Sequence, residues 1–337
     1  MSAGRTRRRL LAAGTMLAAL PASASVRAQV PPGAGAGPLT LAVAESPYTL
    51  PLLIAEKLNY FAAEGLALRV MRSPVGRVNL ERVLSGEAHF ATVADAPIMF
   101  ASMKRRDFGI VATISRSFGT NGMMVRADRG IEKPADLRGK RIAAPRGSGG
   151  HFFVDTFLLF HGLTTADVIL VQMESTRIVD ALVNGDIDGA GIFGALAYHA
   201  QRRLGSNARI VPGPAFFAVN FNLVSAPASS GVSDADVLKL LRAVERANEL
   251  IRRNPAQARQ LAAGILKVEP HEVERTWDSF EYRLQLAQPL IAQLEAQVRW
   301  AMREKLLPPG SSAPDFLDLV RAEPLRQLDA RAVRLVR

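Results

Sequence analysis

Short apolar runs and longer amphipathic segments alternate along the first third of the chain. An apolar run of strand length bounded by glycine, proline or serine indicates a strand, and apolar residues at every third or fourth position indicate a helix. The runs predict strands at 39–44, 66–71, 89–93 and 109–114. Helices are expected between them, at 50–61, from Val78 to Leu84, and from an N-cap at Asp95 to Lys104. Strands joined by helices form a mostly parallel sheet with helices on its faces.

A second series of the same kind follows. Its expected strands are 122–126, 141–144, 169–172, 187–192, 209–211 and 216–224, and its expected helices begin near His151 and cover 178–183 and 195–203. After Val224 the pattern is helical, with helices expected from an N-cap at Ser233 and at 256–266, 270–280 and 289–305. A run of amphipathic helices needs a surface to cover, and the first sheet is the one available.

The return of the chain to the first sheet predicts two lobes. Residues 39–118 and 222–337 would form lobe 1, and residues 119–221 would form lobe 2. Two crossings are expected, near 113–122 and near 220–225, and paired crossings serve as hinges when lobes close on a ligand. The expected fold class is therefore α/β, with two lobes, each a mostly parallel sheet flanked by helices, and two hinge crossings.

The first 28 residues have the features of an export signal. A basic start from Arg5 to Arg9 precedes an apolar stretch, Leu10–Leu20, and small residues lead to Ala28. The apolar stretch is too short to cross a bilayer. The start also resembles a twin-arginine signal, so that route and the general secretory route both stay open. Residues 29–38 read as a linker rich in proline, glycine and alanine, so we expect an exported periplasmic protein.

Composition and charge narrow the function. The formal charge is +11, but five of the arginines lie in the first 29 residues, and no basic run later in the chain is interleaved with aromatics. A nucleic-acid partner is therefore not expected. The chain has no cysteine, which excludes disulfides, thiol chemistry and the attachment point of a lipid anchor.

Catalytic and metal-binding motifs find no support either. The five histidines are scattered, without the spacing of a zinc site. Ser148 lies in R-G-S-G-G, which lacks the G-x-S-x-G pattern of a nucleophile elbow. We expect no metal, no cofactor and no catalysis.

The segment from Gly139 to Leu163 organises the expected binding site. It reads as a short strand, a glycine-rich turn and a helix. The first N–H groups of a helix lack partners within it and favour an anion. Gly147, Gly149 and Gly150 lack a Cβ, which would let a bound group approach the backbone. The alternative is an ordinary strand-to-helix turn, and no nucleotide-binding glycine motif is present.

Four segments, taken in order, resemble a known family. They are 84–91 (LSGEAHFA), 135–142 (ADLRGKRI), 147–148 (GS) and 181–189 (ALVNGDIDG). This series resembles the type II periplasmic solute-binding proteins of ABC importers, in particular the group for nitrate, sulfonates, taurine and pyrimidine precursors of thiamine. The resemblance extends over residues 39–305 and implies a two-lobed fold, a small-molecule ligand and a permease partner. The chain departs from the family pattern at His89 and at 192–194 (IFG), which leaves the ligand class open.

In open α/β sheets, ligands bind beyond the carboxyl ends of the strands, where loops lead into helices. The candidate ligand-binding residues are Ser46, Pro47, Tyr48, Arg77, Asp95, Ala96, Ser115, Ser117, Gly147, Ser148, Gly149, His151, Phe193 and Asn220. Several helix N-termini would converge there and favour a carboxylate, a sulfonate or a similar group. Tyr48 could instead pack under its loop, Arg77 could be a surface arginine, Asp95 a helix cap, and His151 a solvated first-turn histidine.

The expected function is the periplasmic solute-binding component of an ABC importer. It would be a soluble monomer without a lipid anchor, and it would close around a small organic anion or a pyrimidine-like solute and deliver it to an inner-membrane permease. Two alternatives stay open. One is an enzyme of pyrimidine-precursor synthesis on the same scaffold, against which the export signal argues; the other is a subunit that presents its ligand to a membrane sensor.

Overall fold

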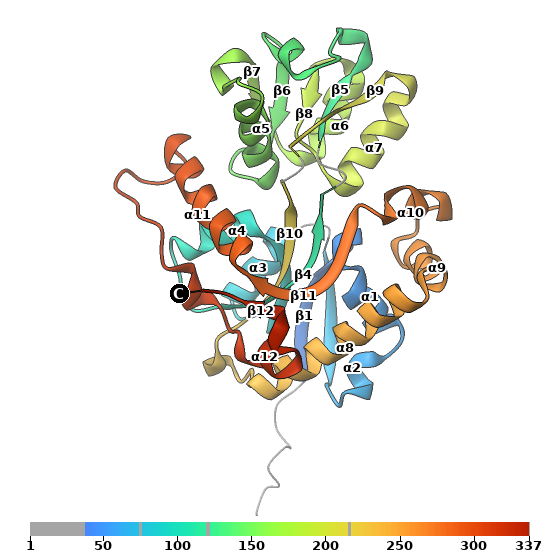
Figure 1. The fold of residues 1–337 in the computed structure, drawn as a ribbon, viewed down its shortest axis with the longest axis vertical. Helices are drawn as coiled ribbons and strands as arrows, with labels where there is room; N and C mark the ends of the chain where they lie inside the picture. The colour runs from blue at the N-terminus through green and yellow to red at the C-terminus, as the bar shows by residue number, and fades with distance from the viewer. Residues whose placement is uncertain (1–37, 74–75, 119–121, 215–216, 337) are drawn as a thin grey trace, which may run out of the picture. The chain divides into compact units, whose positions relative to one another are not determined.

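The computed structural model describes residues 38–73, 76–118, 122–214 and 217–336. The predicted signal peptide and all but the last residue of the predicted linker lie outside these ranges. Two sheets are present, and we name each lobe by its sheet. Lobe 1 holds a seven-stranded sheet and lobe 2 a five-stranded sheet (Figure 1).

The sheet of lobe 1 has the strand order β12-β11-β4-β10-β3-β1-β2. Its strands are β1 (Leu39–Ala44), β2 (Leu68–Ser73), β3 (Phe90–Ala94), β4 (Gly109–Ser117), β10 (Val219–Ser225), β11 (Phe280–Ala287) and β12 (Val333–Arg334). β1 runs parallel to β2 and β3, and β11 to β12, whereas β10 is antiparallel to β3 and β4, and β11 to β4. The sheet is thus mixed rather than mostly parallel, because β10 returns from lobe 2 and enters the sheet in the opposite direction to β3 and β4.

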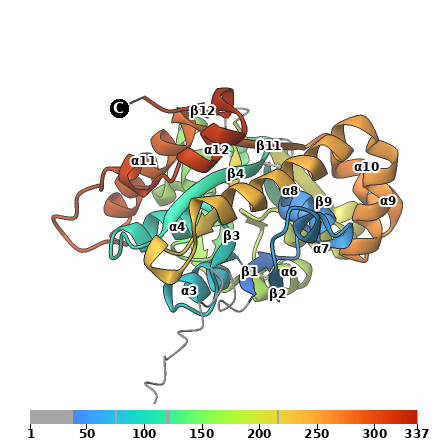
Figure 2. The same cartoon turned by 90° about the horizontal axis from the view of Figure 1, so that it is seen from below.

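Helices cover both faces of this sheet. They are α1 (Leu50–Lys57), α2 (Tyr60–Ala63), α3 (Gly76–Leu84), α4 (Asp95–Ser102), α8 (Asp234–Arg253), α9 (Pro255–Leu266), α10 (Pro270–Trp277), α11 (Gln288–Arg303) and α12 (Glu323–Leu328). Figure 2 shows α3, α4 and α11 on one side of the strands and α8 on the other, and α1 packs against α8. Ser233 caps α8 as predicted, since its Oγ accepts the N–H of Asp236 at 3.1 Å.

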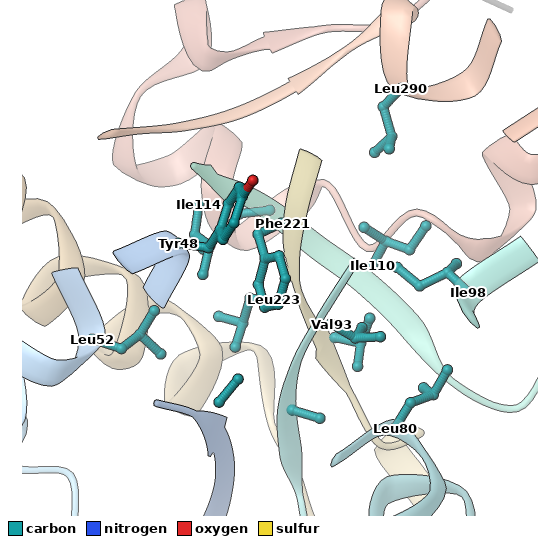
Figure 3. Close-up of a cluster of buried hydrophobic side chains, with 14 of the residues drawn as sticks. Tyr48, Leu52, Leu80, Val93, Ile98, Ile110, Ile114, Phe221, Leu223 and Leu290 are labelled. Carbon is teal, nitrogen blue, oxygen red and sulfur yellow. The ribbon is translucent and has the colours of Figure 1, made fainter. Parts of the chain in front are cut away.

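The core of lobe 1 fills the space between these helices and the sheet. Figure 3 shows Leu80 and Ile98 of the helices near Val93 and Ile110 of the strands, and Leu52 of α1 further away, at the left of the view. All five are at most 2% exposed. Burial of one such side chain stabilises a fold by about 1.5–3 kcal/mol.

The sheet of lobe 2 has the strand order β7-β6-β8-β5-β9 and is also mixed. Its elements are β5 (Gly122–Arg126), β6 (Arg141–Ala144), β7 (Ile169–Gln172), β8 (Gly189–Ala190), β9 (Ala208–Pro212), α5 (Gly149–Phe160), α6 (Ser175–Asn184) and α7 (Gly194–Leu204).

Side chains of β6 alternate between two hydrophobic cores, as the two-residue repeat of a strand requires. Ala143 belongs to a core of its own with residues of α6 and α7. Ile142 and Ala144 belong to the core that includes α5 and continues into lobe 1. On the α5 side the two lobes therefore share one continuous core.

Several elements have other bounds than predicted, among them β2, β8 and β10, and three differences change the continuity, the kind or the place of an element. The predicted helix 50–61 is broken at Asn59, which takes the left-handed conformation (φ 57°) that asparagine tolerates better than most residues. The predicted helix 270–280 ends at Trp277 and is followed by β11, so the region after Val224 is not all helical. The second crossing precedes Val219, and the predicted range 220–225 lies within β10.

Candidate functional site

The loop after β1 is held in place by strands that follow much later in the chain. Ser46 Oγ accepts the N–H of Tyr48 at 3.3 Å and begins a short 3-10 turn. Ser115 Oγ in β4 donates to the carbonyl oxygen of Tyr48 at 2.6 Å. The hydroxyl of Tyr282 in β11 donates to the carbonyl oxygen of Pro47 at 2.9 Å. The loop is therefore fixed to lobe 1 before any ligand arrives.

Three strands of lobe 1 meet where the chain leaves for lobe 2: β4 ends there, and β10 and β11 begin there. Ser117, the last residue of β4, is paired with Val219 of β10 and with Phe280 of β11. The ring of Tyr48 stacks on Phe221 with centroids 5.2 Å apart and meets Phe280 edge-on at 5.0 Å. Tyr48 is buried, so its ring packs under the loop, as the alternative interpretation of this residue expected.

A buried carboxylate, Asp95, joins α4 to β10 and α11. Its Oδ1 accepts the N–H of Ala96 at 2.8 Å and Nε2 of Gln297 at 3.0 Å. Its Oδ2 accepts Nδ2 of Asn220 at 3.3 Å and Nε2 of Gln293. A carboxylate offers about four lone-pair positions, so these four donors saturate Asp95. We call Asp95, Asn220, Gln293 and Gln297 the amide network; within it Asp95 serves the fold and has no acceptor position left for a ligand.

Electrostatics support this role for Asp95. Burial raises the pKa of its carboxyl group, although hydrogen bonds from Gln297 and Asn220 act in the opposite direction. Asp95 is the first residue of α4 and Ala94 is the N-cap, so the predicted N-cap is one residue late. The network continues to β4, because Arg116 Nε donates to Asn220 Oδ1 at 3.1 Å.

The glycine-rich turn leads into α5 as predicted. Ser148 is the N-cap, and its Oγ accepts the N–H of His151 at 3.2 Å and donates to the carbonyl oxygen of Pro145 at 2.7 Å. The N–H of Gly147 donates to Nδ1 of His151 at 3.3 Å. Because Nδ1 accepts this bond, the proton of the neutral imidazole lies on Nε2.

The glycines of this turn differ in what surrounds them. A Cβ at Gly150 would lie 2.4 Å from the carbonyl oxygen of Gly191, so Gly150 makes room for the chain after β8. A Cβ at Gly147, whose φ is +67°, would meet Phe100 of α4 at 3.6 Å. A Cβ at Gly149 would have no described atom within 4 Å. We expected room for a ligand at all three glycines, but the structure leaves open space only at Gly149 among them.

Aromatic rings from both lobes meet at the start of α5. We call them the aromatic junction, which consists of Phe100, His151, Phe152, Phe153, Phe193, Phe217 and Trp300. The ring of Trp300, on α11, lies 5.1 Å from that of His151 and 5.4 Å from that of Phe152, both edge-on. On the lobe 2 side, Phe153 meets Phe217 edge-on at 5.0 Å.

Two ring N–H groups in the junction are buried without an acceptor among the described residues. They are Nε2 of His151 and Nε1 of Trp300, and each side chain is 1% exposed. Burial, followed by the charge of Arg146, lowers the pKa of His151 to about 4. The imidazole is therefore neutral near pH 7 and can donate from Nε2. A buried donor without a partner costs about 1–3 kcal/mol, so an incoming acceptor would be favoured here.

Ion pairs connect the lobes on two sides of the crossing strands. Asp155 of α5 pairs with Arg303 of α11, and Glu272 of α10 pairs with Arg202 of α7 at 3.6 Å. Figure 1 shows α11 and α10 on opposite sides of β4 and β10. Both carboxylates are buried. Burial raises the pKa of Asp155, and the nearby Arg303 opposes this shift.

Most of the candidate residues fall into three groups. The first is the β1 loop with Ser115, the second is Asp95 and Ala96 with Asn220, and the third is the glycine turn with His151 and Phe193. Arg77 lies outside them, because its side chain is 71% exposed and pairs with Glu81, one turn further along α3. It is a surface arginine, as the alternative expected.

Helix α11 contributes residues that the sequence analysis did not select. Gln293, Gln297 and Trp300 follow one another at spacings of four and three, which places them on one face of the helix. The sequence does contain a signal for these residues. Two glutamines lie in the apolar stripe that also carries Leu290 and Leu294, and a polar residue on a buried face needs a hydrogen-bond partner.

A cavity of about 880 Å³ lies elsewhere, between α8, β11 and α12. Charged side chains around it pair with each other, Arg252 with Glu245 and Arg331 with Asp329. It contains none of the candidate residues. Within the described ranges no three His, Cys, Asp or Glu side chains gather as metal ligands, and none of the described helices is long and apolar enough to span a membrane.

Solved structures share this architecture. The periplasmic aliphatic sulphonate binding protein SsuA of Escherichia coli matches with a TM-score of 0.72 at 17% identity, over 85% of this chain and 98% of that protein. The alkanesulfonate-binding protein SsuA of Xanthomonas axonopodis pv. citri, bound to MOPS, matches with 0.69 at 20%, over 89% and 99%. The desulfurization enzyme DszB matches with 0.62 at 19%, over 87% and 99%. The protein therefore has the two-lobed periplasmic-binding-protein fold.

The sequence places the chain more narrowly. The model of the NMT1/THI5-like family matches residues 46–258, more than half of the chain, so the protein belongs to this family.

Three curated relatives illustrate the range of the family. A binding protein of Brucella abortus is 27% identical over 210 residues, 59% of this chain and 62% of that protein. The taurine-binding periplasmic protein of Escherichia coli is 28% identical over 144 residues, 42% of this chain and 44% of that protein. The 4-amino-5-hydroxymethyl-2-methylpyrimidine phosphate synthase of Schizosaccharomyces pombe is 25% identical over 150 residues, 43% and 41%. The aligned regions span less than two thirds of each relative.

Proposed function

We propose that this protein is the periplasmic solute-binding component of an ABC importer and that it binds a small organic anion between its lobes. The predicted division was 39–118 with 222–337 for lobe 1 and 119–221 for lobe 2; since β10 starts at Val219 in the sheet of lobe 1, we take lobe 2 to end before Val219. The lobes would close by bending at the two crossings. The bound molecule would then pass to an inner-membrane permease.

The observation that carries the proposal is the composition of the junction at the start of α5. The first turn of α5 presents backbone N–H groups, and the N–H groups of His151 and Trp300 lie beside it without acceptors among the described residues. Donors at a helix N-terminus in a site shielded from water favour an acceptor with negative charge. Trp300 comes from lobe 1 and His151 from lobe 2, so a molecule bound by both would stabilise the closed form.

The relatives agree with a binding role in part. They include taurine- and sulfonate-binding proteins, and also a pyrimidine phosphate synthase and a desulfurization enzyme. The chain has no cysteine, and the described residues place no pair of acid–base groups at the junction, where His151 is neutral near pH 7. These features favour binding over turnover.

A ligand screen tests the proposal. The protein is purified from the periplasmic fraction of its host, and its melting temperature is measured with sulfonates, carboxylates, nitrate and pyrimidines. A ligand at 100 times its Kd stabilises the folded state by about 2.7 kcal/mol, which corresponds to a shift of several degrees. No shift with any compound, together with no molecule retained in native mass spectrometry, would refute the proposal. Chemical change of a bound compound would favour the enzyme alternative.

A further inference from the structure

The side chains around Nε2 of His151 and Nε1 of Trp300, which have no acceptor among the described residues, limit the chemical class of the ligand. The seven members of the aromatic junction are six rings without charge and one imidazole that is neutral near pH 7. Phe152 and Phe217 are 8% and 7% exposed, and Phe153 is fully buried. The charge of Arg146 acts on His151 and contributes to its lowered pKa, but Arg146 is not one of the rings.

A hydrophilic ligand would fit these surroundings poorly. An aliphatic anion with a second polar end would leave that end among phenylalanine rings, and a buried polar group without a partner costs free energy. An aromatic body would instead meet Phe152, Phe217 and Trp300 in the edge-on or tilted arrangements that these rings already adopt with each other.

The position of the rings explains how selection would work. Trp300 is tied to α4 through Phe100, with ring centroids 6.3 Å apart, and to α5 through His151 and Phe152. A planar body inserted beside Trp300 would therefore contact both lobes at once. Its acceptor group would reach the two N–H donors at the edges of the same rings.

On the basis of the function proposed above, we propose that the ligand is an aromatic organic anion, an arenesulfonate or arenecarboxylate. Its ring lies among the side chains of the aromatic junction, and its oxygens accept hydrogen bonds from Nε1 of Trp300, Nε2 of His151 and the first turn of α5. Trp300 and His151 are the residues that decide specificity.

Matched ligand pairs test the ligand class on the unaltered protein. Isothermal titration calorimetry compares benzenesulfonate with ethanesulfonate, and benzoate with propanoate. We expect each aromatic member to bind at least 10-fold more tightly than its aliphatic partner. Equal binding, or tighter binding of the aliphatic members, overturns the inference and leaves the proposed function standing. Binding of none of the four, with no response in the wider screen, removes both.

Fluorescence tests the position of the ligand. The chain has two tryptophans, Trp277 and Trp300, and Trp277 lies on α10 outside the junction. Trp277→Phe therefore leaves Trp300 as the only indole, and we expect benzenesulfonate to change its emission while the affinity stays as in the unaltered protein. An unchanged emission at saturating benzenesulfonate would place the ligand away from Trp300 and overturn the assignment.

One substitution tests whether the indole of Trp300 binds the anion. Trp300→Phe keeps an aromatic side chain and removes the donor, and it should weaken benzenesulfonate binding by roughly 10- to 100-fold. Circular dichroism checks that the variant folds, and Trp277→Phe is the control for loss of an indole. Unchanged affinity in a folded Trp300→Phe protein would show that the indole N–H does not bind the anion.

Discussion

Replacement of Asp95 by alanine should destabilise the protein strongly, because this carboxylate is buried and accepts hydrogen bonds from buried donors. The carboxylate is the only acceptor, among the described residues, for the N–H of Ala96 and for Nε2 of Gln297. Gln293 would keep the carbonyl oxygen of Ala218 at 3.1 Å, and Asn220 would keep Oε1 of Gln293 at 2.9 Å. Two buried donors are thus left unsatisfied, at about 1–3 kcal/mol each. Relief of the buried charge offsets part of this cost, so we expect a net loss of about 2–4 kcal/mol.

The control is Asp95→Asn, which keeps one acceptor oxygen and removes the charge. It should lose less than half as much as Asp95→Ala in urea unfolding at pH 7. The pH dependence provides a second test. Because the pKa of Asp95 in the folded protein is raised above its ordinary value of 3.8, its contribution to stability is complete below 3.8 and declines as the pH rises through the folded pKa. The advantage of the unaltered protein over Asp95→Asn should therefore shrink from pH 4 to pH 7.

Two results would contradict this reasoning. One is an Asp95→Ala protein whose free energy of unfolding lies within about 0.5 kcal/mol of the original, the scatter expected of surface substitutions. The other is an Asp95→Asn protein as damaged as Asp95→Ala. Either would mean that the amide network does not hold α4, β10 and α11 together in solution.

Three further predictions concern the start of α5 and its contacts. Gly150→Ala should cost about 1–3 kcal/mol in urea unfolding because its Cβ meets backbone, whereas Gly149→Ala, with open space, should change stability by less than about 1 kcal/mol; equal effects would refute the contact. Asp155→Asn and Arg303→Gln, combined in a double-mutant cycle, should show coupling of about 1 kcal/mol, and strict additivity would mean that the pair is not formed. The pKa of His151 in the folded protein is lowered to about 4, so its contribution to the free energy of unfolding is complete above pH 6.5 and is lost as the pH falls towards 4. His151→Gln should therefore reduce the slope of stability against pH between pH 4 and 6.5 by up to about 1.4 kcal/mol per pH unit. An unchanged slope would contradict the lowered pKa.

Elements dominated by local pattern could be predicted from the sequence. The strands at 39–44, 122–126, 141–144 and 169–172 have the predicted ends, because each is an apolar run bounded by turn residues. The strand β11 was missed although the signal was present. Its sequence FEYRLQL alternates apolar and polar residues, but only two residues separate it from α10, and the predicted helix 270–280 includes its first residue, Phe280.

The candidate site could be predicted only in part, because some of its residues meet only through long-range packing. The rule for loops after strands selected His151 and Phe193, which belong to the aromatic junction, and Asn220, which belongs to the amide network. It could not select Trp300 or Gln297, because these belong to the side of a helix and meet their partners across long sequence separations. Such contacts depend on how α11 packs against lobe 2, which no local pattern encodes.

The paired ends of β4 and β10 have a consequence for how this architecture can change. Ser117 and Val219 sit opposite each other in antiparallel strands, so the chain leaves and re-enters the seven-stranded sheet through neighbouring positions. A tight turn of two residues is enough to join such ends. Another domain could therefore replace lobe 2 without changing the register of the seven-stranded sheet, provided that it supplies new partners for Trp300 and for the core shared at α5.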